Sequence, residues 1–105
     1  MISEEPLEFL KNRREGAKKT AEAAKEKGGD SILSYYHFAA KNKPYGKVIG
    51  VFKAEGLDAA LSFCKKEYKN LMKNVDLDMS QKAYQAIVGE IEVYGECYIR
   101  LMQER

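Results

Sequence analysis

The side chains that could carry chemistry in this chain are few, and they lack the spacing of a catalytic or metal site. His37 is the only histidine among 105 residues, and Cys64 and Cys97 are the only cysteines. A carboxylate-bridged two-metal site in a helical bundle needs two Glu-x-x-His pairs, and a zinc site needs several closely spaced histidine or cysteine ligands. The sequence therefore predicts no metal and no cofactor. A cysteine nucleophile would need His37 as its base, but no local motif joins them, so an enzyme is the less favoured interpretation.

The remaining candidates for acid–base chemistry have structural explanations in the pattern itself. Glu92 and Glu96 fall on the polar face of the last expected helix, where Glu96 is placed to pair with Arg100 one turn on. We interpret Glu90 as a solvated residue at the edge of that face. His37 stands in the aromatic run 35–38 and is expected to be partly buried, and both cysteines are expected to be buried structural thiols.

One short segment combines positive charge with an aromatic ring. The segment 41–47 contains Lys41, Lys43, Tyr45 and Lys47 at the expected start of a helix, where free backbone N–H groups favour an anion. Lysines interleaved with aromatic rings can also bind single-stranded nucleic acid. Weak binding of an anion or of nucleic acid is therefore an alternative function. The structural alternative is a solvated basic loop with Tyr45 packed in the core.

Composition is that of an ordinary globular chain, with 45% hydrophobic and 32% charged residues and a formal net charge of +2. The charge is uneven: residues 30–54 hold four lysines against one aspartate, whereas residues 75–105 hold three basic and six acidic residues. No apolar run approaches the roughly 18 residues needed to span a bilayer, and the acidic start has no signal-peptide pattern. We therefore expect no membrane association and a cytoplasmic location.

Apolar periodicity predicts helices over 3–27, from 30 or 31 to 42, over 44–55, over 59–74 and over 80–104. Lys43 precedes Pro44, which disfavours helical backbone at Lys43, so the second helix is expected to end or to kink there. Asp58 is expected to cap the fourth helix. For the last helix, either Asp78 with Gln81 forms a capping box or Ser80 is the cap.

The last helix is apolar over most of its circumference. Its main stripe, expected to face the core, has six members, with Val88 and Met102 beside them: Tyr84, Ile87, Ile91, Tyr94, Tyr98 and Leu101. A second row widens the stripe on one flank: Ala83, Ala86, Val93 and Cys97. Such a helix should lie between neighbours rather than on a surface. We expect it to be the hub of the fold.

The segments 25–42 and 53–70 align without gaps at an offset of 28 residues. Lys25, Gly28 and Asp30 match Lys53, Gly56 and Asp58. The same offset aligns one helical face of the two preceding helices: Ala17, Thr20, Ala21 and Ala24 with Tyr45, Val48, Ile49 and Phe52. This weak repeat predicts that the two helix–glycine–helix turns are alike, whether or not the chain arose by duplication.

These observations predict an all-α domain spanning 1–105, a bundle of four to five helices made of two hairpins and a long central C-terminal helix. The first helix has a thin apolar stripe and the last an over-wide one, so the chain's own elements are not expected to cover all apolar surface. We therefore favour a non-enzymatic protein–protein interaction or assembly module, with a protein partner or a homodimer through the C-terminal helix. Four residues are the candidate interaction surface: Phe9, Tyr94, Tyr98 and Met102.

Overall fold

The computed structural model describes residues 5–76 and 78–105 and confirms the all-α expectation. Its elements are α1 (Glu5–Lys27), a 3₁₀ turn η1 (Gly29–Ser31), α2 (Ile32–Ala39), α3 (Asn42–Glu55), α4 (Leu57–Lys73) and α5 (Gln81–Met102). The described residues contain no strand, and none of their helices is long and apolar enough to cross a membrane. The expected cap and first turn at Ser3 and Glu4 lie outside the described residues.

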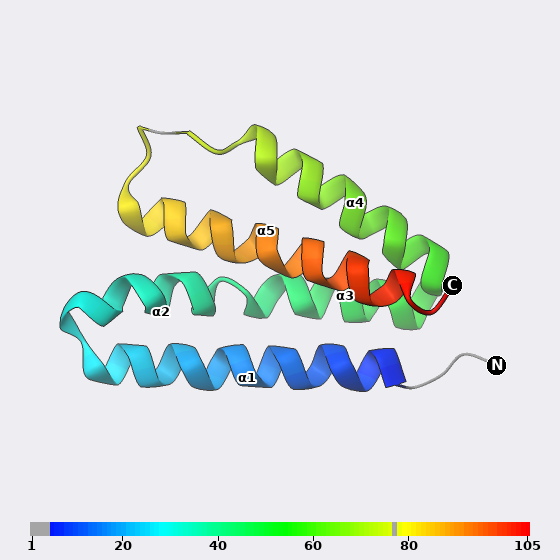
Figure 1. Ribbon diagram of the computed structural model, residues 1–105, viewed down its shortest axis with the longest axis horizontal. Helices are drawn as coiled ribbons and strands as arrows, with labels where there is room; N and C mark the ends of the chain where they lie inside the picture. The colour runs from blue at the N-terminus through cyan, green and yellow to red at the C-terminus, as the bar shows by residue number, and fades with distance from the viewer. Residues whose placement is uncertain (1–4, 77) are drawn as a thin grey trace.

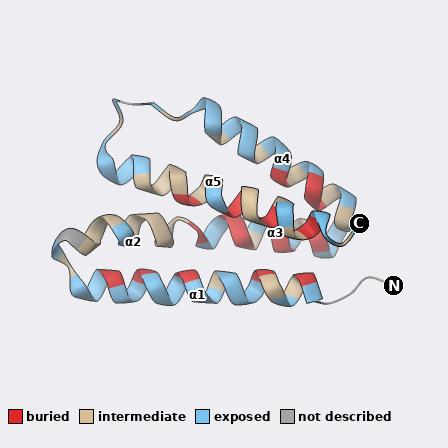
Figure 2. Ribbon diagram, in the orientation of Figure 1, coloured by how far each residue is buried: buried red, intermediate tan, exposed pale blue. Residues whose placement is uncertain are grey.

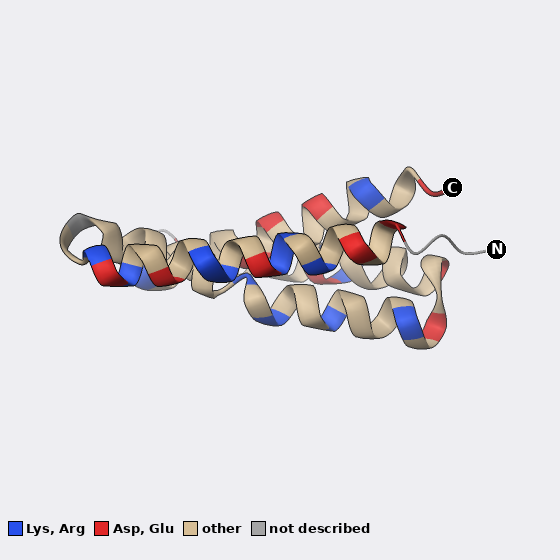
Figure 3. Cartoon of the chain, turned by 90° about the horizontal axis from the view of Figure 1, so that it is seen from below, with Lys and Arg blue, Asp and Glu red and all other residues tan. Residues whose placement is uncertain are grey.

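The helices run alternately up and down in four rods, because α2 and α3 lie end to end as one rod (Figure 1). α1 packs along α2 and α3, and α5 lies between α4 and the rod formed by α2 and α3. α1 presents both basic and acidic side chains along its solvent face (Figure 3), in keeping with its thin apolar stripe. The molecule measures 47 × 29 × 19 Å, so it is only about two helix diameters thick.

α5 is the hub of the bundle, as expected, since it contacts α1, α2, α3 and α4. Its most buried side chains, however, are Val93, Tyr94, Cys97 and Leu101. The buried positions of α5 lie toward its C-terminal end (Figure 2). Only two of these belong to the expected main stripe. Val93 and Cys97 come from the row that was expected to be a flank.

Tyr84, expected at the core, is exposed, while Ile87, Ile91 and Tyr98 are half-buried; Met102, placed beside the main stripe, is exposed as well. The physical reason is the close approach of α2. Gly89 of α5 lies directly against the backbone carbonyl of His37, where no side chain fits. Close packing turns the side with Gly89, Val93 and Cys97 toward the neighbouring helices, so part of the expected main stripe, Tyr84 above all, stays outside the core.

The break between α2 and α3 differs from the expectation. α2 ends at Ala39, and α3 already begins at Asn42, so Lys43 is helical although it precedes Pro44. Pro44 is the third residue of α3, within the first turn, where a backbone N–H has no helical partner to lose. The preference against helix before proline is therefore overridden by packing.

The helix starts are partly as expected. Ser80 caps α5, since its Oγ accepts a hydrogen bond from the Ala83 N–H at 3.2 Å, which decides between the two caps considered. α4 begins at Leu57 with Gly56 as its cap, so Asp58 lies in the first turn instead of at the cap. Ser31 makes no side-chain cap for α2, which follows directly on η1.

The two glycine turns are alike, as the repeat predicts. Gly28 has φ 66° and ψ −161°, and Gly56 has φ 92° and ψ −173°. Each donates its N–H to the carbonyl four residues earlier, at Ala24 and Phe52 respectively, over 3.1 and 3.0 Å. Both conformations lie in a region that side-chain-bearing residues rarely adopt.

We predict that Gly56→Ala and Gly28→Ala each lower the free energy of unfolding by about 1–3 kcal/mol. A Cβ at either position meets no atom within 4 Å, so the cost arises from the backbone alone. The measurement is urea denaturation followed by circular dichroism. Gly16→Ala, in the exposed interior of α1 and equally free of contacts, is the control and should stabilise by up to about 1 kcal/mol. The prediction would be contradicted if all three variants changed the free energy of unfolding by the same amount.

Candidate interaction surface

One apolar side of α5 is only partly covered by the rest of the bundle, and it is the main surface feature of the molecule. We call it the outer stripe: Tyr84, Val88, Ile91, Gly95, Tyr98, Ile99 and Met102. Ile99 is 64% exposed, Tyr84 42% and Met102 40%. The stripe extends over about 27 Å at the rise of an α-helix. Except for Ile99, its members follow each other in steps of four and three, the spacing of a coiled-coil seam.

A shallow apolar groove joins the stripe to α4. It has a volume of about 340 Å³ and is lined mainly by Tyr68 of α4 and by Tyr98 and Ile99 of α5. The groove exists because Gly95 has no side chain: the Tyr68 ring lies over it, and a Cβ there would come within 3.3 Å of Tyr68 Cε2. Tyr94 contributes only to the floor, since it is buried.

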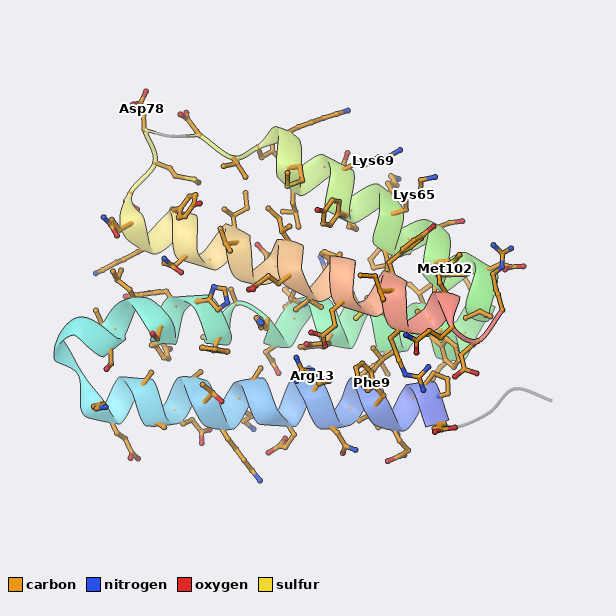
Figure 4. All side chains as sticks on the ribbon, in the orientation of Figure 1. Phe9, Arg13, Lys65, Lys69, Asp78 and Met102 are labelled. Atoms are coloured by element: carbon orange, nitrogen blue, oxygen red, sulfur yellow. The ribbon has the colours of Figure 1, made fainter. Side chains whose placement is uncertain are left out.

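The two edges of this surface carry opposite charge. On the α4 edge, the groove is bordered by the exposed Lys65 and Lys69 (Figure 4). On the α2 edge lies Glu92, whose side chain is 48% exposed and whose Oε2 is 2.6 Å from His37 Nε2. Lys41 Nζ approaches the same oxygen at 3.6 Å. An apolar strip bordered by lysines on one side and by a carboxylate on the other is suited to a partner with the reverse arrangement.

Beside this edge, one polar cluster fixes α5 to α1 and α3. Arg13 donates two hydrogen bonds to Glu96, from Nε at 2.7 Å and from Nη2 at 2.8 Å, and Tyr45 Oη donates to Glu96 at 3.1 Å. Partial burial by itself would raise the pKa of Glu96, but the hydrogen bonds and positive charge of Arg13 outweigh it and lower that pKa. Burial and the nearby Glu96 charge raise the pKa of Tyr45, so Tyr45 stays a neutral donor.

The lowered pKa of Glu96 predicts an acid-sensitive contribution to stability. A carboxyl group whose pKa is lower in the folded than in the unfolded chain stabilises the fold above its unfolded pKa, and this contribution is lost as the pH falls through the folded pKa. We expect Glu96→Gln to lose less stability than the unsubstituted chain between about pH 6 and about pH 3. The readout is the urea midpoint at each pH. If the urea midpoint of Glu96→Gln fell as steeply between these pH values as that of the unsubstituted chain, the prediction would be wrong.

The expected pairing of Glu96 with Arg100 is wrong. Arg100 Nη1 instead bonds to Glu104 Oε1 at 2.8 Å, and its guanidinium also lies 5.3 Å from the centre of the Phe9 ring. Glu90 is also not a solvated edge residue: it is partly buried, and this burial raises its pKa against the opposing effect of Lys47 and Lys43.

The four basic–aromatic candidates do not form one surface. Tyr45 is a core residue, and Lys41 is buried between the Phe38 ring and Glu92. Lys43 and Lys47 are exposed, and both act on the Glu90 carboxyl. Binding of an anion or nucleic acid therefore stays a prediction, with half of its residues placed inside the bundle.

The four candidate interaction residues are only partly on the outer stripe. Tyr98 and Met102 belong to it, and Tyr94 lies beneath it in the core. Phe9 is half-buried in α1 under Arg100, and it lines a second hollow, which Ile99 also lines. Ile99, the most exposed of these apolar side chains, was missed. Its spacing in the sequence could have indicated it: Ile99 follows Gly95 by four residues and precedes Met102 by three, which places all three on one face of the helix.

The histidine and cysteine expectations agree with the structure. The His37 side chain is largely buried, and both cysteines are free and fully buried. A hydrogen bond with Cys64, together with burial, raises the pKa of the Cys97 thiol, which keeps it protonated and weakly reactive. Among the described residues, no three histidine, cysteine, aspartate or glutamate side chains gather as a metal site would require.

The outer stripe and its charged edges are thus the feature of this molecule that calls for a functional explanation. Comparison of the chain with protein-family models, with curated proteins and with solved structures found no match.

Proposed function

We propose that this chain is a helical assembly module that associates with a second copy of itself through the outer stripe of α5. The single observation that carries the proposal is an apolar stripe about 27 Å long on α5, which is exposed at Tyr84, Ile99 and Met102 and half-buried between them. Exposed apolar side chains that gather on one face of a protein mark interaction sites more often than single ones scattered over the surface.

The charged edges favour a second copy as the occupant. A two-fold interface brings the same surface patch of both copies together, so the patch must complement itself. Here the stripe has Lys65 and Lys69 along one edge and Glu92 along the other. The basic edge of each copy can then face the acidic edge of the other, whereas a uniformly basic surface would require an acidic partner.

Packing inside the monomer supports a structural rather than a catalytic role. Arg13, Glu96 and Tyr45 are joined to one another by hydrogen bonds, and the Cys97 thiol is held protonated. The two free buried cysteines also suit a reducing compartment, so the cytoplasm remains the proposed location.

Sedimentation equilibrium over a wide range of protein concentration tests the proposal. We expect a reversible equilibrium between the 11.9 kDa chain and a species of twice that mass. A single species of 11.9 kDa at every concentration would refute self-association.

A further inference from the structure

We infer that the two copies pack with their α5 helices parallel, related by a two-fold axis that runs along the outer stripe. This inference rests on the proposed self-association. A symmetric contact through one helix face allows two arrangements. If the axis runs along α5, the helices are parallel and the α4 edge of one copy lies over the α2 edge of the other. If the axis crosses α5, the helices are antiparallel and like edges meet.

The charges on the two edges distinguish these arrangements. In the antiparallel pair, the row formed by Lys65 and Lys69 faces the same row of the second copy, and Glu92 faces Glu92. In the parallel pair, the lysine row of each copy faces the edge that carries Glu92. Opposite charges placed across an interface fix its register, and like charges disfavour it.

The basic residues that line the hollow beside Glu92 are Arg13, Lys41 and Arg100, and each of them is engaged by a carboxylate, Arg100 by Glu104. Lys41 is buried, and its Nζ is directed to Glu92. The guanidinium of Arg13 is held by its two bonds to Glu96. Glu92 itself keeps about half of its side chain exposed even though His37 and Lys41 approach it.

The positions of the lysines and of Glu92 along the axis of α5 also favour the parallel arrangement. Lys65 and Lys69 line the same groove as Tyr94, Gly95, Tyr98 and Ile99 of α5. The Tyr68 ring lies against Gly95, so Lys69, the next residue of the antiparallel α4, lies within about one helical turn of the level of Glu92. A two-fold axis along α5 preserves that level, and it therefore brings Lys69 of each copy opposite Glu92 of the other. In a parallel seam, each stripe residue also lies close to its own counterpart.

Cysteine cross-linking at the two ends of the stripe tests the direction. Tyr84→Cys and Met102→Cys place one exposed thiol at each end, about 27 Å apart along α5. Mild oxidation with diamide removes one proton and one electron from each of two thiols and joins the sulfurs in a disulfide between copies. We expect each variant alone to form a covalent dimer. The unsubstituted chain, whose thiols are buried, is the control and should form none.

The possible outcomes separate this inference from the proposed function. A covalent dimer only in the mixture of the two variants would overturn the parallel arrangement and leave self-association intact. No cross-link in variants that still sediment as dimers would also overturn it. A chain that sediments only as a monomer would remove both proposals.

Charge reversal gives a second test whose sign depends on the direction. In the parallel arrangement, Lys65→Glu combined with Lys69→Glu removes attraction and adds repulsion, so the dissociation constant should rise by about tenfold at low salt and by less at high salt. In the antiparallel arrangement, the carboxylates replace one repelling row by another, and the dissociation constant should change little. An unchanged or lower dissociation constant would overturn the inference.

Discussion

Replacing Gly89 by alanine is expected to lower the free energy of unfolding by about 3 kcal/mol or more. The added Cβ would overlap the carbonyl oxygen of His37, which belongs to the backbone of α2 and cannot rotate away. α2 and α5 would have to separate along their whole contact, which is one of the two most extensive that α5 makes. For a domain of this size, that is a large part of a total stability of about 5–15 kcal/mol.

The matched control is Gly50→Ala in the middle of α3. Gly50 is exposed, and a Cβ there meets nothing within 4 Å. Alanine favours helix over glycine by about 1 kcal/mol, so this variant should be more stable than the unsubstituted chain. Urea denaturation of both variants, followed by circular dichroism, should therefore show shifts of opposite sign. A Gly89→Ala variant as stable as Gly50→Ala would show that α2 does not approach α5 at this point.

The second large effect is expected on association. Ile99→Glu should raise the dissociation constant of the dimer by at least about a hundredfold. Burial of an isoleucine side chain contributes about 1.5–3 kcal/mol, and a two-fold interface loses this contribution twice. Because Ile99 is 64% exposed in the monomer, the fold itself should be unaffected.

The control for Ile99→Glu is Ala23→Glu, which makes the same change in charge at an exposed position of α1. Sedimentation equilibrium of both variants gives the dissociation constants, and urea denaturation shows that both are folded. We expect Ala23→Glu to leave association almost unchanged. If Ile99→Glu associates as well as Ala23→Glu, the outer stripe is not the interface.

Local signals were sufficient to predict the helices. The cap at Ser80, the glycine stops at Gly28 and Gly56, and the periodicity of α4 each depend on neighbours within a few residues. The errors in helix bounds occurred where packing overrides such signals, as at Lys43 before Pro44. The burial of His37 and of both cysteines also followed from their apolar surroundings.

The rotation of α5 about its own axis could not be predicted. The helix has two apolar sides, and hydrophobicity alone favours the bulkier one as the core side. The small residue Gly89 decides otherwise, because it admits the backbone of α2. The hydrogen bonds between Arg13 and Glu96 join residues 83 positions apart, and no local spacing in the sequence indicates such a pair. An i, i+4 partner for Glu96 was the reasonable local expectation, yet Arg100 forms that contact with Glu104.

Self-association through the outer stripe requires that a second copy covers Ile99. Isotope-filtered nuclear Overhauser spectra of a mixture of ¹³C-labelled and unlabelled chains measure this directly, since only contacts between copies give cross-peaks. We predict cross-peaks from the Ile99 and Met102 methyl groups of one copy to outer-stripe protons of the other. Spectra in which these methyl groups show contacts only within their own chain would contradict the account.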